Sequence, residues 1–79
     1  MGTDHTKLHP DMGTYRFGRT AVYRTYATLE QVQRALAEQV EDDVMGRPHR
    51  LLGEILRENN WITEAQEKLV LDEMGVGDQ

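Results

Sequence analysis

The sequence predicts an all-α fold of four short helices, arranged as two repeated helix-turn-helix hairpins. Three observations predict it: two amphipathic segments begin with a capping pattern, turn-forming residues end each segment, and similar residues recur 35 positions apart. The chain has 79 residues and no Cys, which indicates one small domain without a disulfide framework. Its stability must therefore come from packed apolar faces, from a bound ligand or partner, or from self-association.

Residues 28–45 are predicted to form the first long helix. Thr28 is placed to cap it, and Gln31 to reach back to the capping residue, as in a capping box. Apolar residues then recur at nearly fourfold spacing and predict a stripe that faces the core: Leu29, Val32, Leu36, Val40 and Val44. Gly46 and Pro48 are predicted to end this helix, since Gly tolerates a left-handed cap and Pro cannot continue the helix.

The second half of the chain contains the next two predicted helices. Pro48 suits the first turn of one helix, and Asn-rich residues 58–60 suit its end. Its apolar residues are Leu51, Leu52, Ile55 and Leu56. A second capping box, Thr63 with Gln66, then predicts a helix that runs to about Met74.

Residues 15–26 suit a strand or a helix, because Thr, Tyr and Val favour strands while the alternation of apolar residues is incomplete. An internal repeat decides between them. Placing residues 16–39 over residues 51–74 matches five identical pairs without a gap: Gly18 with Gly53, Thr28 with Thr63, Gln31 with Gln66, Leu36 with Leu71, and Glu38 with Glu73. We therefore predict a duplication, and a helix over residues 16–26 by analogy with residues 51–59.

The two ends of the chain are polar and show no helical period. His5 and His9 would share a metal only on a helix, which Pro10 opposes, so no metal site is predicted. The predicted organisation is a flexible N-terminal arm at residues 1–14, a duplicated helical domain at residues 15–75, and a frayed C-terminus at residues 76–79.

The net charge of -5 is unevenly distributed along the chain. Residues 1–37 carry five basic and three acidic side chains, whereas residues 38–79 carry four basic and eleven acidic ones. The acidic second half argues against general nucleic-acid binding, because phosphates would be repelled. The basic residues Arg16, Arg19, Arg24 and Arg34 suit either a solvated surface or contact with a small anion or an acidic partner, such as the acidic half of a second copy.

Several other functions are not indicated by the sequence. No apolar run is long enough to span a membrane, and the N-terminus lacks a signal-peptide core, so we expect a soluble cytoplasmic protein without membrane insertion. No nucleophile, base and acid set is suggested, and the acidic run at residues 41–43 lies on a helix, where consecutive side chains diverge. We therefore predict no catalytic residue, no enzyme and no cofactor.

The segments "RFGRTAVYRTYATLEQVQRALAEQ" and "LLGEILRENNWITEAQEKLVLDEM" resemble the tandem repeat in the N-terminal domain of type II secretion and type IV pilus assembly ATPases. That resemblance implies a bacterial accessory domain without the ATPase domain. The sequence also has no phosphate-binding loop with Lys-Ser or Lys-Thr, which excludes ATP hydrolysis. The function implied first is a non-catalytic regulatory or adaptor module that binds a protein partner, such as a component of a secretion or pilus machine.

The alternative implied by the resemblance is a receptor for cyclic di-GMP, which one branch of that family binds. The residues of this alternative ligand site are Arg16, Gly18, Gln39, Arg50 and Gly53, where Arg50 lies one place before the position of the family's arginine. In that reading the glycines let the backbone approach the ligand, and arginine meets a phosphate or stacks on guanine. This sequence departs from the family pattern where Leu51 replaces an arginine, Thr25 and Asn60 replace turn glycines, and Met74 replaces a terminal glutamine.

Overall fold

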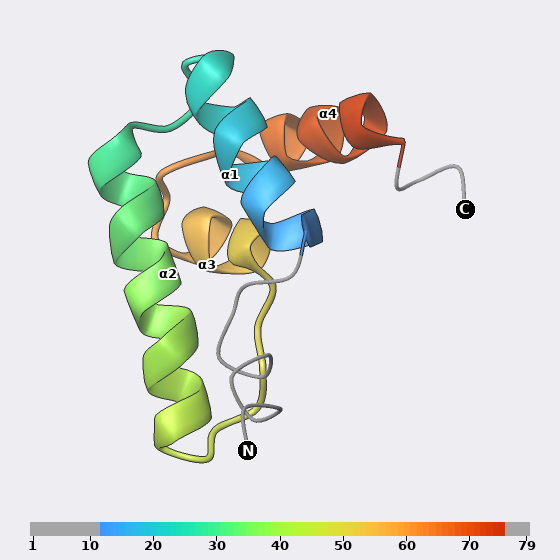
Figure 1. The fold of residues 1–79 in the computed structure, drawn as a ribbon. Coiled ribbons are helices and arrows are strands. Elements are labelled where there is room, and N and C mark those ends of the chain that lie inside the picture. Colours follow the sequence, from blue (N-terminus) through green and yellow to red (C-terminus); the bar gives the residue numbers. More distant parts are fainter. Residues whose placement is uncertain (1–11, 76–79) are drawn as a thin grey trace.

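A computed structural model describes residues 12–75, which form four α-helices and no strand (Figure 1). The helices are α1 (Met12–Tyr23), α2 (Leu29–Val44), α3 (Leu52–Glu58) and α4 (Glu64–Met74). The predicted all-α class with four helices is therefore confirmed. Residues 1–11, which include His5 and His9, and residues 76–79 lie outside the described part of the chain.

The helices α1 and α3 occupy the middle of the fold, with α2 on one side and α4 on the other (Figure 1). Each middle helix packs against all three of the others. We call α1 with α2 the first hairpin and α3 with α4 the second hairpin. The long helix α2 therefore contacts the second hairpin chiefly through α3.

Helix α1 begins at Met12, so the prediction of a flexible arm through residue 14 is wrong at its last residues. Thr14 is buried, and it lies on the same helical face as Phe17 and Ala21, which are also buried. The first residues of this helix are polar and show no helical period in the sequence, although Thr14 among them packs against the domain.

The turns that end α1 and α3 have the same backbone hydrogen bonds. The amide of Tyr26 donates to the carbonyl oxygen of Ala21 at 2.9 Å, and the amide of Trp61 donates to that of Leu56 at 2.9 Å. The residue before each aromatic residue, Thr25 or Asn60, has φ = 62°, in the left-handed region. Both ends are Schellman motifs in which a non-glycine residue occupies the position that usually favours glycine.

The two predicted capping boxes are present. In α2 the hydroxyl of Thr28 accepts from the amide of Gln31 at 3.1 Å, and in α4 the hydroxyl of Thr63 accepts from the amide of Gln66 at 3.0 Å. Each glutamine side chain returns to accept from the amide of its threonine. The local geometry at helix starts and turns therefore recurs at the offset of the sequence repeat, and the duplication itself stays a prediction.

The predicted start of the third helix at Pro48 is wrong, because residues 47–51 are not helical and α3 begins at Leu52. Glu54 caps this helix by accepting a hydrogen bond from the amide of Leu51 at 2.8 Å. The predicted end of α2 is confirmed: Gly46 adopts φ = 73°, and the amide of Arg47 donates to the carbonyl oxygen of Asp42.

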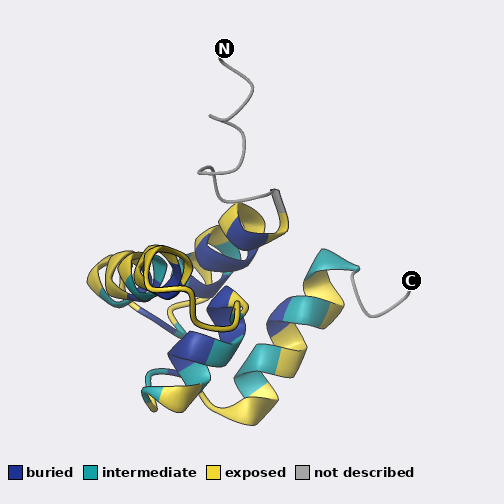
Figure 2. Ribbon diagram, turned by 90° about the horizontal axis from the view of Figure 1, so that it is seen from below, coloured by how far each residue is buried: buried dark blue, intermediate teal, exposed yellow. Residues whose placement is uncertain are grey.

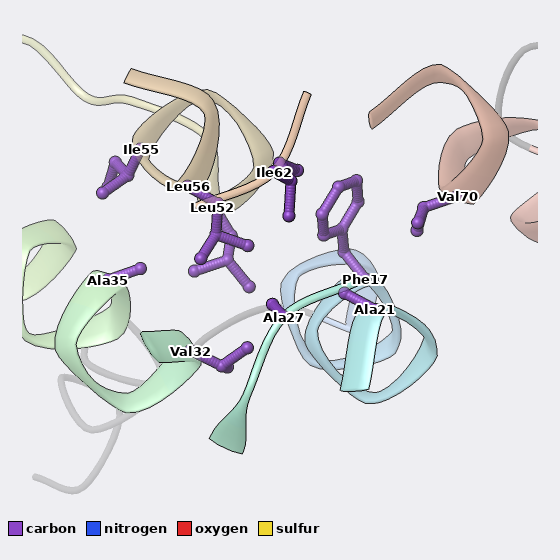
Figure 3. Close-up of a cluster of buried hydrophobic side chains, with 10 residues drawn as sticks. All are labelled: Phe17, Ala21, Ala27, Val32, Ala35, Leu52, Ile55, Leu56, Ile62 and Val70. Carbon is purple, nitrogen blue, oxygen red and sulfur yellow. The ribbon is translucent and has the colours of Figure 1, made fainter. Parts of the chain in front are cut away.

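The core joins all four helices (Figure 3). Phe17 points from α1 toward Ile62 and Val70, which belong to the second half of the chain (Figure 3). The buried apolar residues are Phe17, Ala21, Ala27, Val32, Ala35, Leu52, Ile55, Leu56, Ile62 and Val70. Helix α4, which leads to the C-terminus, is mostly intermediate or exposed, and Val70 is its buried residue (Figure 2).

The predicted core stripe of α2 is wrong for most of its members. Leu29, Val40 and Val44 are exposed, while the buried residues of this helix are Val32, Ala35, Gln39 and Asp42. The buried face is therefore rotated away from the apolar stripe. The reason is that the C-terminal half of α2 packs against Arg50 and the connection between the hairpins, which favours polar partners.

Candidate functional site

The five residues of the predicted nucleotide site lie in three places. Gln39 and Arg50 lie together, because the side-chain amide of Gln39 donates to the carbonyl oxygen of Arg50 at 3.0 Å. Gly18 and Gly53 are both buried where α1 crosses α3. Arg16 is exposed on α1 and donates to the carbonyl oxygen of Met74 at 3.3 Å, next to α4.

The guanidinium of Arg50 is already surrounded by carboxylates. It donates to Asp42 and Glu58 at 2.8 Å each, and to Glu38 at 3.4 Å. Hydrogen bonds to Asp42 and then to Glu58 raise the pKa of Arg50 further above its usual range. A phosphate would have to displace these carboxylates, so the arrangement favours a structural role for Arg50.

Asp42 lies at the centre of this group, with 2% of its side chain exposed. The hydrogen bond from Arg50 lowers the pKa of Asp42 despite its burial, and a second bond from Arg47 acts in the same direction. Asn59 from the end of α3 also donates to Glu38 at 3.2 Å. We call these residues the Arg50 cluster: Glu38, Gln39, Asp42, Arg47, Arg50, Glu58 and Asn59.

The space beside each of the two glycines is filled by side chains of the protein itself. A Cβ atom added to Gly53 would lie 2.8 Å from Cζ of Phe17, and one added to Gly18 would lie 3.3 Å from Cδ2 of Leu52. Each glycine thus accommodates the apolar residue that precedes the other glycine in sequence. This reciprocal contact gives both glycines a packing role, because it brings α1 and α3 close together.

A groove of about 570 Å³ lies between α1 and α2. Its walls are mainly apolar, and several of the lining side chains are large and solvent-exposed. They include Tyr15, Val22 and Tyr23 from α1 with Leu29, Val32 and Leu36 from α2. The exposed residues Val40 and Val44 continue the apolar stripe of α2 beyond Leu36. We call this surface the α1–α2 groove; sequence reasoning assigned its α2 side chains to the core.

The charged residue in the lining of this groove is Arg19. Its guanidinium carbon lies 6.0 Å from the centroid of the Tyr15 ring. Within residues 12–75, no carboxylate lies within ion-pair distance of Arg19, and α1 itself contains no acidic residue. Arg24 is different, because its guanidinium donates to Glu73 of α4 at 2.8 Å. Arg19 is therefore an exposed cation beside an apolar surface.

A second, smaller hollow of about 170 Å³ lies between α1, α3 and α4. Its apolar lining includes Phe17, Leu52 and Met74, and its charged residue is Glu67. The carboxylate of Glu67 accepts from the guanidinium of Arg57 at 2.7 Å. Because this carboxylate is ion-paired, the hollow offers an apolar surface and no free acid or base.

Within residues 12–75, no three His, Asp or Glu side chains are grouped closely enough to hold a metal ion. None of the four described helices combines the length and the hydrophobicity needed to cross a membrane.

Comparison of the chain with protein-family models, with curated proteins and with solved structures found no match. The resemblance to the N-terminal domain of secretion and pilus assembly ATPases therefore rests on the sequence motifs and stays a prediction.

Proposed function

We propose that this chain is a non-catalytic regulatory or adaptor module that acts in the cytoplasm and binds a protein partner through the α1–α2 groove. The observation that carries the proposal is the exposure of large apolar side chains along both edges of the groove. Tyr23 is 77% exposed and Leu29 is 61% exposed. Contiguous apolar surface of this kind marks interaction sites in small proteins, because leaving it in water is unfavourable.

The chemistry of the described side chains supports a non-catalytic role. The carboxylates of the Arg50 cluster and of Glu67 are held in ion pairs, and the α1–α2 groove has Arg19 as its charged residue. General acid-base catalysis needs a positioned group that can exchange protons near neutral pH. The resemblance to the secretion-ATPase domain suggests that the partner is a component of a secretion or pilus machine.

A matched pair of substitutions tests this proposal. Leu29→Gln changes the groove, and Leu69→Gln makes the same change on α4, where Leu69 is 52% exposed and lies outside the groove. Proteins are first captured on the immobilised chain from an extract of the cells that produce it. Each captured protein is then purified and titrated against the wild-type chain and both variants.

We expect Leu29→Gln to weaken binding of the true partner about tenfold, because it removes roughly 1.5 kcal/mol of apolar burial. Leu69→Gln should leave the affinity within about twofold of wild type. Circular dichroism of both variants controls for folding. Equal affinities for the wild type and Leu29→Gln would contradict the proposed groove.

A further inference from the structure

We infer that the α1–α2 groove takes an amphipathic helix of another protein, with carboxylates along the edge that lies against α1. This inference rests on the proposed function, and it adds the chemical class of the partner. Three features of the groove carry it: its shape, the charge of its edge, and the contrast with the surface of α4.

The shape of the groove suits a helix. Two adjacent helices form its walls, and an added helix can place residues one turn apart into such a groove. The apolar edge of α2 from Leu29 to Leu36 is about 10 Å long at 1.5 Å per residue. Val40 and Val44 extend the same edge to about 22 Å, which corresponds to roughly four helical turns. Residues 12–75 contain no strand that could offer an edge to an extended peptide.

The charge of the groove favours acidic residues on the partner. Arg19 lies on the α1 wall of the groove, and neither α1 nor the described ion pairs supply it with a carboxylate. On the opposite wall the polar residue is the uncharged Gln33. A carboxylate next to Arg19 would gain an ion pair, whereas a lysine there would be repelled.

A second copy of this chain is a poorer occupant. Two grooves that meet around a twofold axis would present Arg19 to a groove with the same positive edge. The acidic helix α4 lacks the required apolar stripe, because Val70 is buried and Leu69 is its exposed large apolar side chain. The partner is therefore a different protein, and the wild-type chain should be monomeric in sedimentation experiments.

Two labelled peptides test the inference on the full chain. Both are hydrocarbon-stapled helices of about four turns with the same leucine face. Their flanking positions are all Glu in one peptide and all Lys in the other, and fluorescence anisotropy measures each affinity. The net charge of -5 on the whole chain attracts the Lys peptide at long range, so a preference for the Glu peptide requires a local cation.

We expect the Glu peptide to bind about fivefold more tightly than the Lys peptide, with the difference shrinking at high salt. Arg19→Glu should reverse the order of the two peptides. Arg34→Glu is the matched control, because Arg34 is also exposed, lies outside the groove, and changes the net charge equally. In that variant the Glu peptide should remain preferred.

The possible results separate this inference from the proposed function. Equal binding of both peptides, weakened by Leu29→Gln, would overturn the acidic class and leave the groove as a protein-binding surface. Equal effects of Arg19→Glu and Arg34→Glu would also overturn it, because the preference would then reflect net charge alone. Absence of binding by either peptide, or a wild-type dimer that Leu29→Gln dissociates, would exclude the proposed occupant.

Discussion

Gly53 of α3 lies directly against the ring of Phe17 in α1, so that a Cβ atom at position 53 would be 2.8 Å from Cζ of that ring. The reverse contact is similar, with Gly18 of α1 against Val32 and Leu52. A Cβ atom at position 53 would therefore force the Phe17 ring or the two middle helices to shift. Both glycines match a nucleotide-binding pattern in sequence, yet the space beside each is filled by apolar side chains.

Gly53→Ala should destabilise the fold by about 1–3 kcal/mol, because the added methyl group forces the buried Phe17 ring or the helices to shift. Glu67 is also close, with Oε2 at 3.1 Å from the added atom. Urea unfolding followed by circular dichroism measures the change. Gly18→Ala is the comparison: its nearest contact is 3.0 Å, to a methyl group of Val32, and alanine gains about 0.5–1 kcal/mol of helix preference. Stability of Gly53→Ala equal to wild type would contradict the packing role.

Thr25→Gly should stabilise the chain by about 1 kcal/mol, because a β-branched residue is strained in the left-handed region. Thr25 is exposed and has φ = 62°, so the substitution removes strain without removing buried surface. Thermal unfolding of the purified variant measures the gain. Asn60→Gly is the matched control, since Asn tolerates the same φ better and should give a smaller gain. A loss of stability in Thr25→Gly would show that the threonine side chain itself supports the turn.

Asp42→Asn should lower the melting temperature at neutral pH. In acid, the melting temperature of this variant should depend less on pH than that of the wild type. Arg50 holds the pKa of Asp42 below its usual range, so the folded chain binds fewer protons than the unfolded chain in mild acid. The stabilisation is present above the unfolded pKa of about 3.9, and it is lost as the pH falls through the lower folded value. Melting curves between neutral pH and strong acid measure this. Asp43→Asn, an exposed neighbour, should retain the wild-type profile.

Titration calorimetry with cyclic di-GMP should give no saturable heat with the wild-type chain. Arg50 is neutralised by Asp42, Glu38 and Glu58, and Arg16 lies apart beside α4. A ligand would have to displace charge-assisted hydrogen bonds before it could gain its own. Tight one-to-one binding that Arg16→Ala abolishes would replace the adaptor proposal with the receptor function.

Helix content and helix ends were predictable from the sequence because their signals are local. The capping boxes at Thr28 and Thr63 need residues three positions apart, and the end of α2 at Gly46 needs a single residue with a left-handed backbone. The start of α3 was misplaced because Pro48 satisfies the rule for a first helical turn, although Glu54 supplies the actual cap at Leu51.

The buried face of α2 could not be read from its apolar spacing. Leu29, Val40 and Val44 follow a regular helical period, but the neighbours of α2 are decided by contacts distant in sequence. Gln39 and Asp42 are buried because both form hydrogen bonds with Arg50. Arg50 lies 11 positions after Gln39 and 8 positions after Asp42. The α1–α2 groove was missed for the same reason, since an exposed apolar stripe and a buried one have the same pattern.

The connection between the hairpins at residues 45–51 also governs how two copies of the chain could exchange parts. A domain-swapped dimer would need this connection to open into an extended linker so that each copy received the second hairpin of the other. Opening would separate Arg47 and Arg50 from Asp42, and Gln39 from the Arg50 carbonyl, in one step. These hydrogen bonds hold the connection closed, and they therefore oppose exchange of the second hairpin between two copies.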